Sequence, residues 1–234
     1  MKFKQLLGTA LALVMTLSLS IPVLAADYET SDSYENTGTE QYESIMSTFF
    51  TDVPTDKYYY NTVLWAVKNG ITGGIDETHF GSNLDCTRAQ IVTFLYRWAV
   101  NNDVDVSIGE DTNILSYNDA FSVPEYAISA FQWAVGTGIV QGNHGDLLPN
   151  QSCTRAQAIA FLFRFAQSIG MDVSVGEDTN ILSYNDAFDV SEYAISAFQW
   201  AVGAGIVQGD DGNLTPNVTC SRAQIVTMLY RLLA

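Results

Sequence analysis

The chain has 234 residues, of which 26 are acidic and 10 are basic, and its formal net charge is −16 at neutral pH. Phosphate binding needs a basic footprint, so this composition excludes nucleic acid as a partner. Acidity of this kind favours solubility, and the few cations are therefore the informative charges.

The N-terminus predicts a secretory signal peptide over residues 1–25. Lys2 and Lys4 precede an apolar run from 6 to 24, and Ala25 closes a small-residue cleavage site. Cleavage removes two lysines and no acids, leaving 8 basic and 26 acidic side chains, a charge of −18. Residues 26–48 are polar and acidic with few aliphatics, which predicts a flexible leader. No comparable apolar stretch, lipoprotein cysteine or C-terminal sorting tail follows, so we expect no membrane association after cleavage and a non-covalent attachment at any surface.

An internal repeat dominates the remaining sequence. The segment 106–142 recurs at 173–209 with four substitutions, and a more divergent copy begins near Phe49. Polar connectors separate the copies. The predicted repeats span 49–99, 117–166 and 184–234.

The pattern of each repeat predicts a helix, a loop and a second helix. In the second repeat, Ser122 and Glu125 have capping-box spacing with Pro124 at the first helical position. Apolar residues follow at helical spacing, and Gly136 ends the helix. A turn-rich loop leads to a second helix that starts at Thr154. No stretch shows sustained strand alternation, so the chain is predicted to be all-α.

The divergent first copy shows which positions all three repeats share. These are an aspartate, a Trp-Ala-Val segment, a Gly-Ile pair, a loop glycine and a Thr/Ser-Arg-Ala-Gln segment. The shared residues that are candidates for binding are Asp52, Asp119 and Asp186, Trp65, Trp133 and Trp200, Gly74, Gly142 and Gly209, and Arg88, Arg155 and Arg222.

All six arginines lie in the second helices, in pairs nine residues apart: Arg88/Arg97, Arg155/Arg164 and Arg222/Arg231. Nine residues turn a helix through about 900°, so the two members of a pair face opposite sides and cannot serve one site within a helix. The second members lie near the helix C-termini, where the helix dipole favours a cation.

The first arginine of each pair opposes that dipole, at a cost of about 0.3–1 kcal/mol. An anion held by the helix N-terminal amides and the guanidinium would compensate. An internal ion pair with Asp52, Asp119 or Asp186 would do the same, and both interpretations stay open. The Thr/Ser and Gln beside these arginines have capping-box spacing and need no ligand.

The tryptophans and cysteines can each be explained structurally. Tryptophans at helical spacing serve as core residues or as sugar-stacking platforms. Cys86, Cys153 and Cys220 occur once per repeat at intervals of 67 residues, without a local partner. That spacing favours small buried apolar residues over disulfides or metal ligands.

The repeat resembles the S-layer homology domain. The resemblance rests on Phe50-Thr51-Asp52-Val53, a Trp-Ala helix, Gly-Ile-x-x-Gly, and then Asn-x-x-Cys-Thr-Arg-Ala-Gln, and it covers all three repeats. It implies a pseudo-threefold helical spindle with grooves between repeats. In this family the grooves bind secondary cell-wall polymers without covalent bonds, typically at pyruvylated N-acetylmannosamine.

The resemblance also implies roles for individual residues. The family's binding arginine falls on Arg88, Arg155 and Arg222, and its groove aspartate and loop glycine fall on the shared Asp and Gly positions. Two features depart from the family: Gln90, Gln157 and Gln224 replace its usual Glu, and the connectors lengthen the repeat. The Gln side chains preserve the capping box, so the fold is expected to survive, whereas the exact polymer is open.

Three other functions can be weighed against wall binding. The two histidines, His79 and His144, do not occupy equivalent positions, so we predict no enzymatic activity, catalytic residue or cofactor. Asp-rich loop segments do not complete the twelve-residue calcium pattern ending in Glu, and no metal site is predicted. A surface-layer structural role, or docking of a surface protein, is the alternative function. The expected location is the wall or surface of a Gram-positive-type bacterium.

Overall fold

The computed structural model describes residues 50–109 and 112–234. The predicted signal peptide and leader lie outside the described residues. Within those ranges there is no β-strand beyond isolated bridges, so the prediction of an all-α fold is confirmed. No helix of this part of the chain has both the length and the hydropathy needed to cross a bilayer. The α-helices are α2 (Tyr60–Lys68), α3 (Arg88–Asn101), α4 (Ile128–Gly136), α5 (Arg155–Ser168), α6 (Ile195–Gly203) and α7 (Arg222–Leu233).

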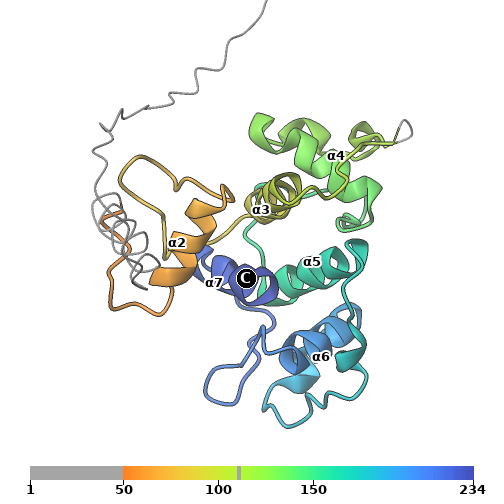
Figure 1. Ribbon diagram of the computed structural model, residues 1–234. Coiled ribbons are helices and arrows are strands. Elements are labelled where there is room, and N and C mark those ends of the chain that lie inside the picture. Colours follow the sequence, from red (N-terminus) through yellow and green to blue (C-terminus); the bar gives the residue numbers. More distant parts are fainter. Residues whose placement is uncertain (1–49, 110–111) are drawn as a thin grey trace, which may run out of the picture.

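Three helix pairs form a closed ring. Each repeat contributes a short helix (α2, α4 or α6) and a long one (α3, α5 or α7), and the long helices lie at the centre (Figure 1). Each long helix packs on the short helix of the next repeat: α3 on α4, α5 on α6, and α7 back on α2. One aromatic contact marks each junction, with ring centroids 5.5–5.7 Å apart: Tyr96–Trp133, Phe163–Trp200 and Tyr230–Trp65. The predicted pseudo-threefold bundle is thereby confirmed.

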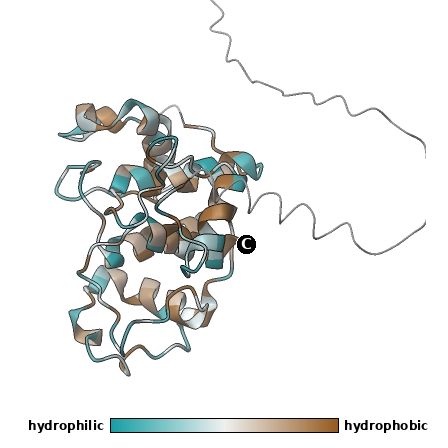
Figure 2. Ribbon diagram, turned by 90° about the vertical axis from the view of Figure 1, so that its left-hand side faces the viewer, coloured by the Kyte–Doolittle hydropathy of each residue, from teal (hydrophilic) through white to brown (hydrophobic). Residues whose placement is uncertain are grey.

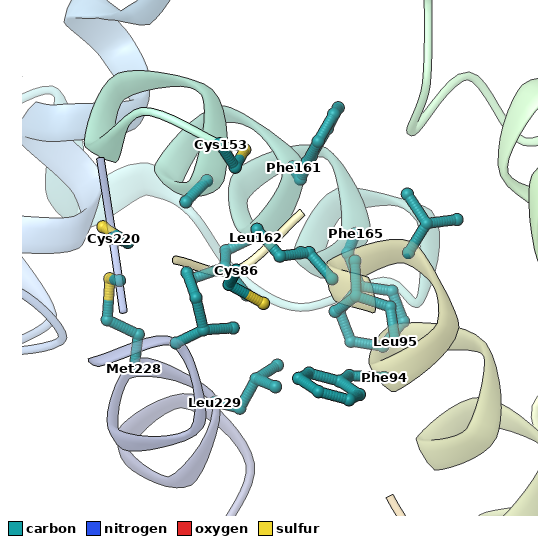
Figure 3. Packing of buried hydrophobic residues seen from close by; sticks show 14 of the residues in the cluster. Cys86, Phe94, Leu95, Cys153, Phe161, Leu162, Phe165, Cys220, Met228 and Leu229 are labelled. Atoms are coloured by element: carbon teal, nitrogen blue, oxygen red, sulfur yellow. The ribbon is translucent and has the colours of Figure 1, made fainter. Parts of the chain in front are cut away.

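The three cysteines join the repeats at the centre of the ring. The backbone N–H of Cys86 donates to the carbonyl of Cys220 (2.8 Å), that of Cys153 to Cys86 (2.9 Å), and that of Cys220 to Cys153 (3.0 Å). Their side chains are buried free thiols among the long helices (Figure 3), as expected of small apolar residues. Because three backbones must meet here, a small side chain suits each position.

The long helices begin where the sequence predicts. Thr87, Thr154 and Ser221 each accept a hydrogen bond from the backbone N–H three residues later, and the Gln at that position bonds back to the cap. All three capping boxes are therefore formed. Figure 2 shows much of the hydrophobic colour on the helices and much of the hydrophilic colour in the connecting loops.

The predicted capping box at Ser122 is wrong. Ser122 ends a short 3-10 helix, η2 (Ala120–Ser122), and Pro124 is itself the N-cap of a second one, η3 (Glu125–Ala127), with no side-chain cap. The α-helix starts only at Ile128. Val123 is extended, with φ −68° and ψ 121°, and its equivalent Val190 is extended in the same way, with φ −72° and ψ 115°, although repeat 3 has Ser191 in place of Pro124. A helix therefore cannot run through this position.

Candidate functional site

Three equivalent grooves lie on the ring, and each one takes residues from all three repeats. A groove is formed by the loop and long helix of one repeat, an arginine from the preceding repeat and a tyrosine from the following repeat. Groove 1 lies along α3 with Arg222 and Tyr126, groove 2 along α5 with Arg88 and Tyr193, and groove 3 along α7 with Arg155 and Tyr58. Their volumes are about 370, 390 and 370 Å³ respectively, within the range of ligand pockets, roughly 300–1,000 Å³.

The first-turn arginines of α3 and α7 are buried, and Nε of each is anchored on a backbone carbonyl; Nη2 of Arg222 also donates to Oγ1 of Thr72 at 3.3 Å. Nε of Arg88 donates to the carbonyl of Leu147 (2.8 Å), and its guanidinium carbon lies 4.9 Å from the centre of the Phe161 ring. Nε of Arg222 donates in the same way to the carbonyl of Phe80 (2.9 Å). Burial lowers the pKa of both arginines, because a guanidinium that has lost part of its hydration holds its charge less easily. An anion in the groove would restore that lost stabilisation.

The second arginine of each pair lines a groove as well. Arg97, Arg164 and Arg231 lie in grooves 1, 2 and 3, so every groove holds two arginines from different repeats. The helix-dipole explanation fits only Arg231, because α7 is the only one of the three long helices with a basic residue in its last turn. The two arginines of one helix do not share a groove, as predicted from their opposite faces. Closure of the ring instead brings the first arginine of one helix and the second arginine of the next helix into the same groove.

Groove 2 shows how closely two cations can be brought together. The guanidinium of Arg164 lies over the Phe161 ring at 5.5 Å, and Arg88 lies over the same ring. Nη1 of Arg164 donates to Oε1 of Gln141 at 3.3 Å. Burial and the positive charge of Arg88 lower the pKa of Arg164. Two partly dehydrated cations around one ring form a strong site for an anion.

The ion-pair interpretation of the first-turn arginines is wrong for this structure. Among the described residues, the only ion pair within 4 Å joins His79 to Asp76, at 3.1 Å in an exposed loop. The shared aspartates instead accept hydrogen bonds from loop N–H groups. Asp119 accepts from Leu147 and Leu148 at 2.7 Å each, and the other two aspartates make equivalent bonds: Asp52 to residues 80–82, and Asp186 to residues 214 and 215.

The contribution expected from helix N-terminal amides is also wrong. The N–H of Arg88 donates to the carbonyl of Gln151, that of Ala89 to Pro149, and that of Gln90 to the capping hydroxyl of Thr87. The other two long helices repeat this pattern with loops of the neighbouring repeat. Because the first-turn amides are already used to join repeats, an anion in the groove depends on side chains.

The shared loop glycines line the grooves and are required by the backbone. Gly142 has φ +70°, and a Cβ atom there would lie 2.6 Å from Cε1 of Tyr117. Gly74 and Gly209 have the same positive φ and the same close approach of an aromatic ring. Only glycine fits such a position without strain. At this position the loop therefore brings its backbone against an aromatic ring, while neighbouring loop side chains such as Gln141 and Asn143 line the groove.

The shared tryptophans lie in the core rather than in the grooves. Trp133 and Trp200 are buried at the junctions between repeats, and Trp65 is half-buried against Tyr230. Of the two roles that the sequence left open, the structure thus places Trp133 and Trp200 in the core and packs Trp65 against the core. A buried indole has no face free for a sugar ring.

Sequence reasoning missed two sets of groove residues. One is the half-exposed tyrosines Tyr58, Tyr126 and Tyr193, whose pKa is raised by burial. The other is the capping glutamines Gln90, Gln157 and Gln224, whose capping role concealed their place in the grooves. The tyrosine follows the shared aspartate by seven residues in repeats 2 and 3 but by six in repeat 1, so a simple alignment of the repeats hides the equivalence.

The fold and the grooves define a class of protein: a module of three repeats, closed into a ring of helix pairs, with an arginine-lined groove between neighbouring repeats. The chain belongs to the S-layer homology domain family: the family model matches residues 49–92, 116–159 and 183–226. Domains of this family attach proteins to the cell surface and are not catalytic.

Curated relatives support the family assignment. The chain is 32% identical over 132 residues to a cell surface protein of Thermoanaerobacter kivui, covering 50% of this chain and 15% of that protein. It is 33% identical over 119 residues to the surface-layer 125 kDa protein of Lysinibacillus sphaericus, covering 49% and 9%. It is 24% identical over 185 residues to an amylopullulanase of Thermoanaerobacterium thermosulfurigenes, covering 79% and 9%. The chain therefore spans only a small part of each of these relatives.

Proposed function

We propose that this chain attaches non-covalently to the bacterial cell wall by binding an anionic secondary cell-wall polymer in its three grooves. One observation carries the proposal: every groove gathers two arginines from different repeats, and no carboxylate among the described residues forms an ion pair with them. Gathering cations in this way is unfavourable without an anion, particularly where they are buried. The chain as a whole has a net charge of −16, so a groove lined by two arginines differs in charge from the rest of the protein.

The groove chemistry suits a carboxylate on a sugar. A guanidinium presents paired N–H donors that match the two oxygens of a carboxylate, and a pyruvyl ketal carries such a group. Gln157 and Tyr193 in groove 2 offer an amide and a phenol for sugar hydroxyls and for the face of a ring. We therefore propose pyruvylated N-acetylmannosamine, the sugar that the family resemblance implies, as the unit bound.

The other shared residues have supporting roles in this proposal. Asp52, Asp119 and Asp186 accept hydrogen bonds from the groove loops, and in two of those loops a carbonyl anchors Arg88 or Arg222. The aspartates therefore position the groove rather than contact the anion. The glycines at 74, 142 and 209 leave room for the ligand. No enzymatic role is proposed, because the amylopullulanase relative is matched over only 9% of its own length.

A second candidate function, docking of a surface protein, is favoured by one observation. Phe121 and Phe188 occupy equivalent positions in repeats 2 and 3, and they are 93% and 90% exposed. A partner that covers an aromatic side chain this exposed removes its apolar surface from water, which favours association. Replacing both by serine is expected to leave wall binding intact, and to abolish capture of a surface protein if this function operates.

The test is co-sedimentation of residues 26–234 with Gram-positive sacculi, half of them stripped of secondary polymer by acid. We expect binding to intact sacculi alone, and loss of binding in an Arg88/Arg155/Arg222→Ala variant whose circular dichroism remains helical. An Arg→Lys variant at the same positions separates charge from the guanidinium fork, and Lys57→Ala, an exposed lysine outside the grooves, is the matched control. Equal binding to stripped and intact sacculi would contradict the proposal.

A competing small ligand gives a sharper result. The methyl glycoside of pyruvylated N-acetylmannosamine should displace the protein from sacculi, whereas the same sugar without the pyruvyl group should not. Displacement by both sugars alike would show that the arginines do not recognise the carboxylate.

A further inference from the structure

The three grooves are not chemically equal, and the difference is clearest between grooves 2 and 3. The two share the arginine pair, the tyrosine, the capping glutamine and the loop glycine. They differ at several lining positions, among them Thr215 and Thr227, which line groove 3 where repeat 2 has Leu148 and Ala160. Two further differences bear on stacking and on charge. Asn143 and Phe161 of groove 2 are replaced by Asp210 and Met228 in groove 3.

The first difference concerns how the arginine is held. In groove 2, Nε of Arg88 is fixed on the carbonyl of Leu147, and the guanidinium lies over Phe161. This leaves both terminal nitrogens without a hydrogen bond to any described residue, so they are available to a ligand. In groove 3, Nε of Arg155 is buried without a hydrogen-bond partner in the described part of the chain, as is Nε of Arg164, the second arginine of groove 2. Met228, which lies among the buried residues of Figure 3, also provides no ring for stacking.

The second difference is charge. Asp210 is exposed and lines groove 3 together with Arg155 and Arg231. Its carboxylate repels an anionic ligand, and it forms no ion pair with either arginine in the described part of the chain. The equivalent Asn143 in groove 2 is neutral and can donate a hydrogen bond to a carboxylate. Of the described residues that line groove 2, none carries a carboxylate.

We infer that groove 2 is a stronger anion site than groove 3, which carries Asp210 and Met228 and binds the same anionic sugar weakly. This inference rests on the proposed function. Asp210 and Met228 are the residues that determine the difference in affinity. The first-turn arginine of groove 3 is present but lacks the carbonyl anchor and the stacking ring that orient Arg88.

Single-groove variants of residues 26–234 test the inference, with the methyl glycoside of pyruvylated N-acetylmannosamine as the probe in titration calorimetry. Arg155→Ala/Arg222→Ala retains the arginine of groove 2, and Arg88→Ala/Arg222→Ala retains that of groove 3. We expect the first variant to bind about tenfold more tightly, because an oriented guanidinium makes the stronger bidentate contact. Equal affinities, or tighter binding by the second variant, would overturn the inference while leaving the proposed function intact.

Exposed loop substitutions provide a test that does not depend on replacing buried arginines. In the otherwise unchanged chain, Asn143→Asp should weaken binding of the probe about threefold, the size expected of one exposed charge. In the groove 3 variant, Asp210→Asn together with Met228→Phe should recover affinity. No effect of Asn143→Asp, or no gain from the double substitution, would show that these residues do not set the difference. If the unaltered protein fails to bind the probe at all, the proposed function fails with it.

Discussion

Asp119 provides a direct test of how the groove is built, because its carboxylate could either contact the ligand or hold the loop. Both of its oxygens accept backbone N–H groups, from Leu147 and Leu148 at 2.7 Å each. The carbonyl of Leu147 in turn accepts from Nε of Arg88. Asp119 is thus connected to the proposed anion site through the backbone of one residue.

Asp119→Ala removes two charge-assisted hydrogen bonds, each worth about 1.5–3 kcal/mol when buried. Because the aspartate is only half-buried, water can replace part of that interaction, so we expect a loss of about 2–3 kcal/mol in the free energy of unfolding. Urea denaturation followed by circular dichroism measures this loss. Binding to sacculi should also fall at temperatures where the variant remains folded, because the anchor of Arg88 is no longer fixed.

Asp189→Ser is the matched control, because it removes an exposed carboxylate at the position where repeat 2 has Ser122. It should change stability by less than about 0.5 kcal/mol. If Asp119→Ala unfolds at the same urea concentration as the unaltered chain but loses wall binding, the carboxylate contacts the ligand directly and the positioning argument is refuted.

Backbone geometry and burial lead to three more expectations. Gly138→Ala should destabilise the fold by roughly 1 kcal/mol, and Gly142→Ala should destabilise it by more, because both glycines have positive φ but only a Cβ at position 142 would clash. The denaturation midpoints of the two variants measure this difference, and equal losses of stability would contradict it. Burial acts to raise the pKa of Asp52, but N–H groups of residues 80–82 outweigh it and hold that pKa below its ordinary value. The contribution of this carboxylate to stability should be complete above the ordinary value and be lost as pH falls through the lowered one. Asp52→Asn should therefore flatten the dependence of the melting temperature on pH in this window, and an unchanged slope would oppose it. Burial raises the pKa of Cys153 to about 12, so its thiol should resist a thiol reagent at about pH 8 until urea unfolds the protein; rapid native labelling would refute this.

Local sequence rules predicted the long helices well. Each start depends on a hydroxyl and a glutamine three residues apart, which interact within one turn, and all three capping boxes form as expected. The same rule failed at Ser122, where an extended valine separates two 3-10 helices, and repeat 3 takes the same path with Ser191 in place of Pro124. The break therefore belongs to the repeat and does not depend on the proline.

The groove could be predicted only in part. Sequence alone identified Arg88 as a cation that needs a partner, and this residue does line a groove. Its anchor is the carbonyl of Leu147, 59 residues away, and its neighbour in the groove is Arg164 from another repeat. Such contacts depend on how the ring closes rather than on spacing along the chain. The assignment of Arg164 to the helix dipole failed for a local reason: α5 continues to Ser168, so Arg164 lies outside its last turn.

Ring closure also explains why three repeats act as one binding unit. Linear repeat arrays add stability unit by unit and need caps at both ends. Here α7 packs back on α2, and the backbone bonds among the three cysteines complete the ring. Every groove takes its loop from one repeat, its first-turn arginine from a second and its tyrosine from a third. A fragment of two repeats would hold no complete groove, so stability and binding must both depend on the presence of all three.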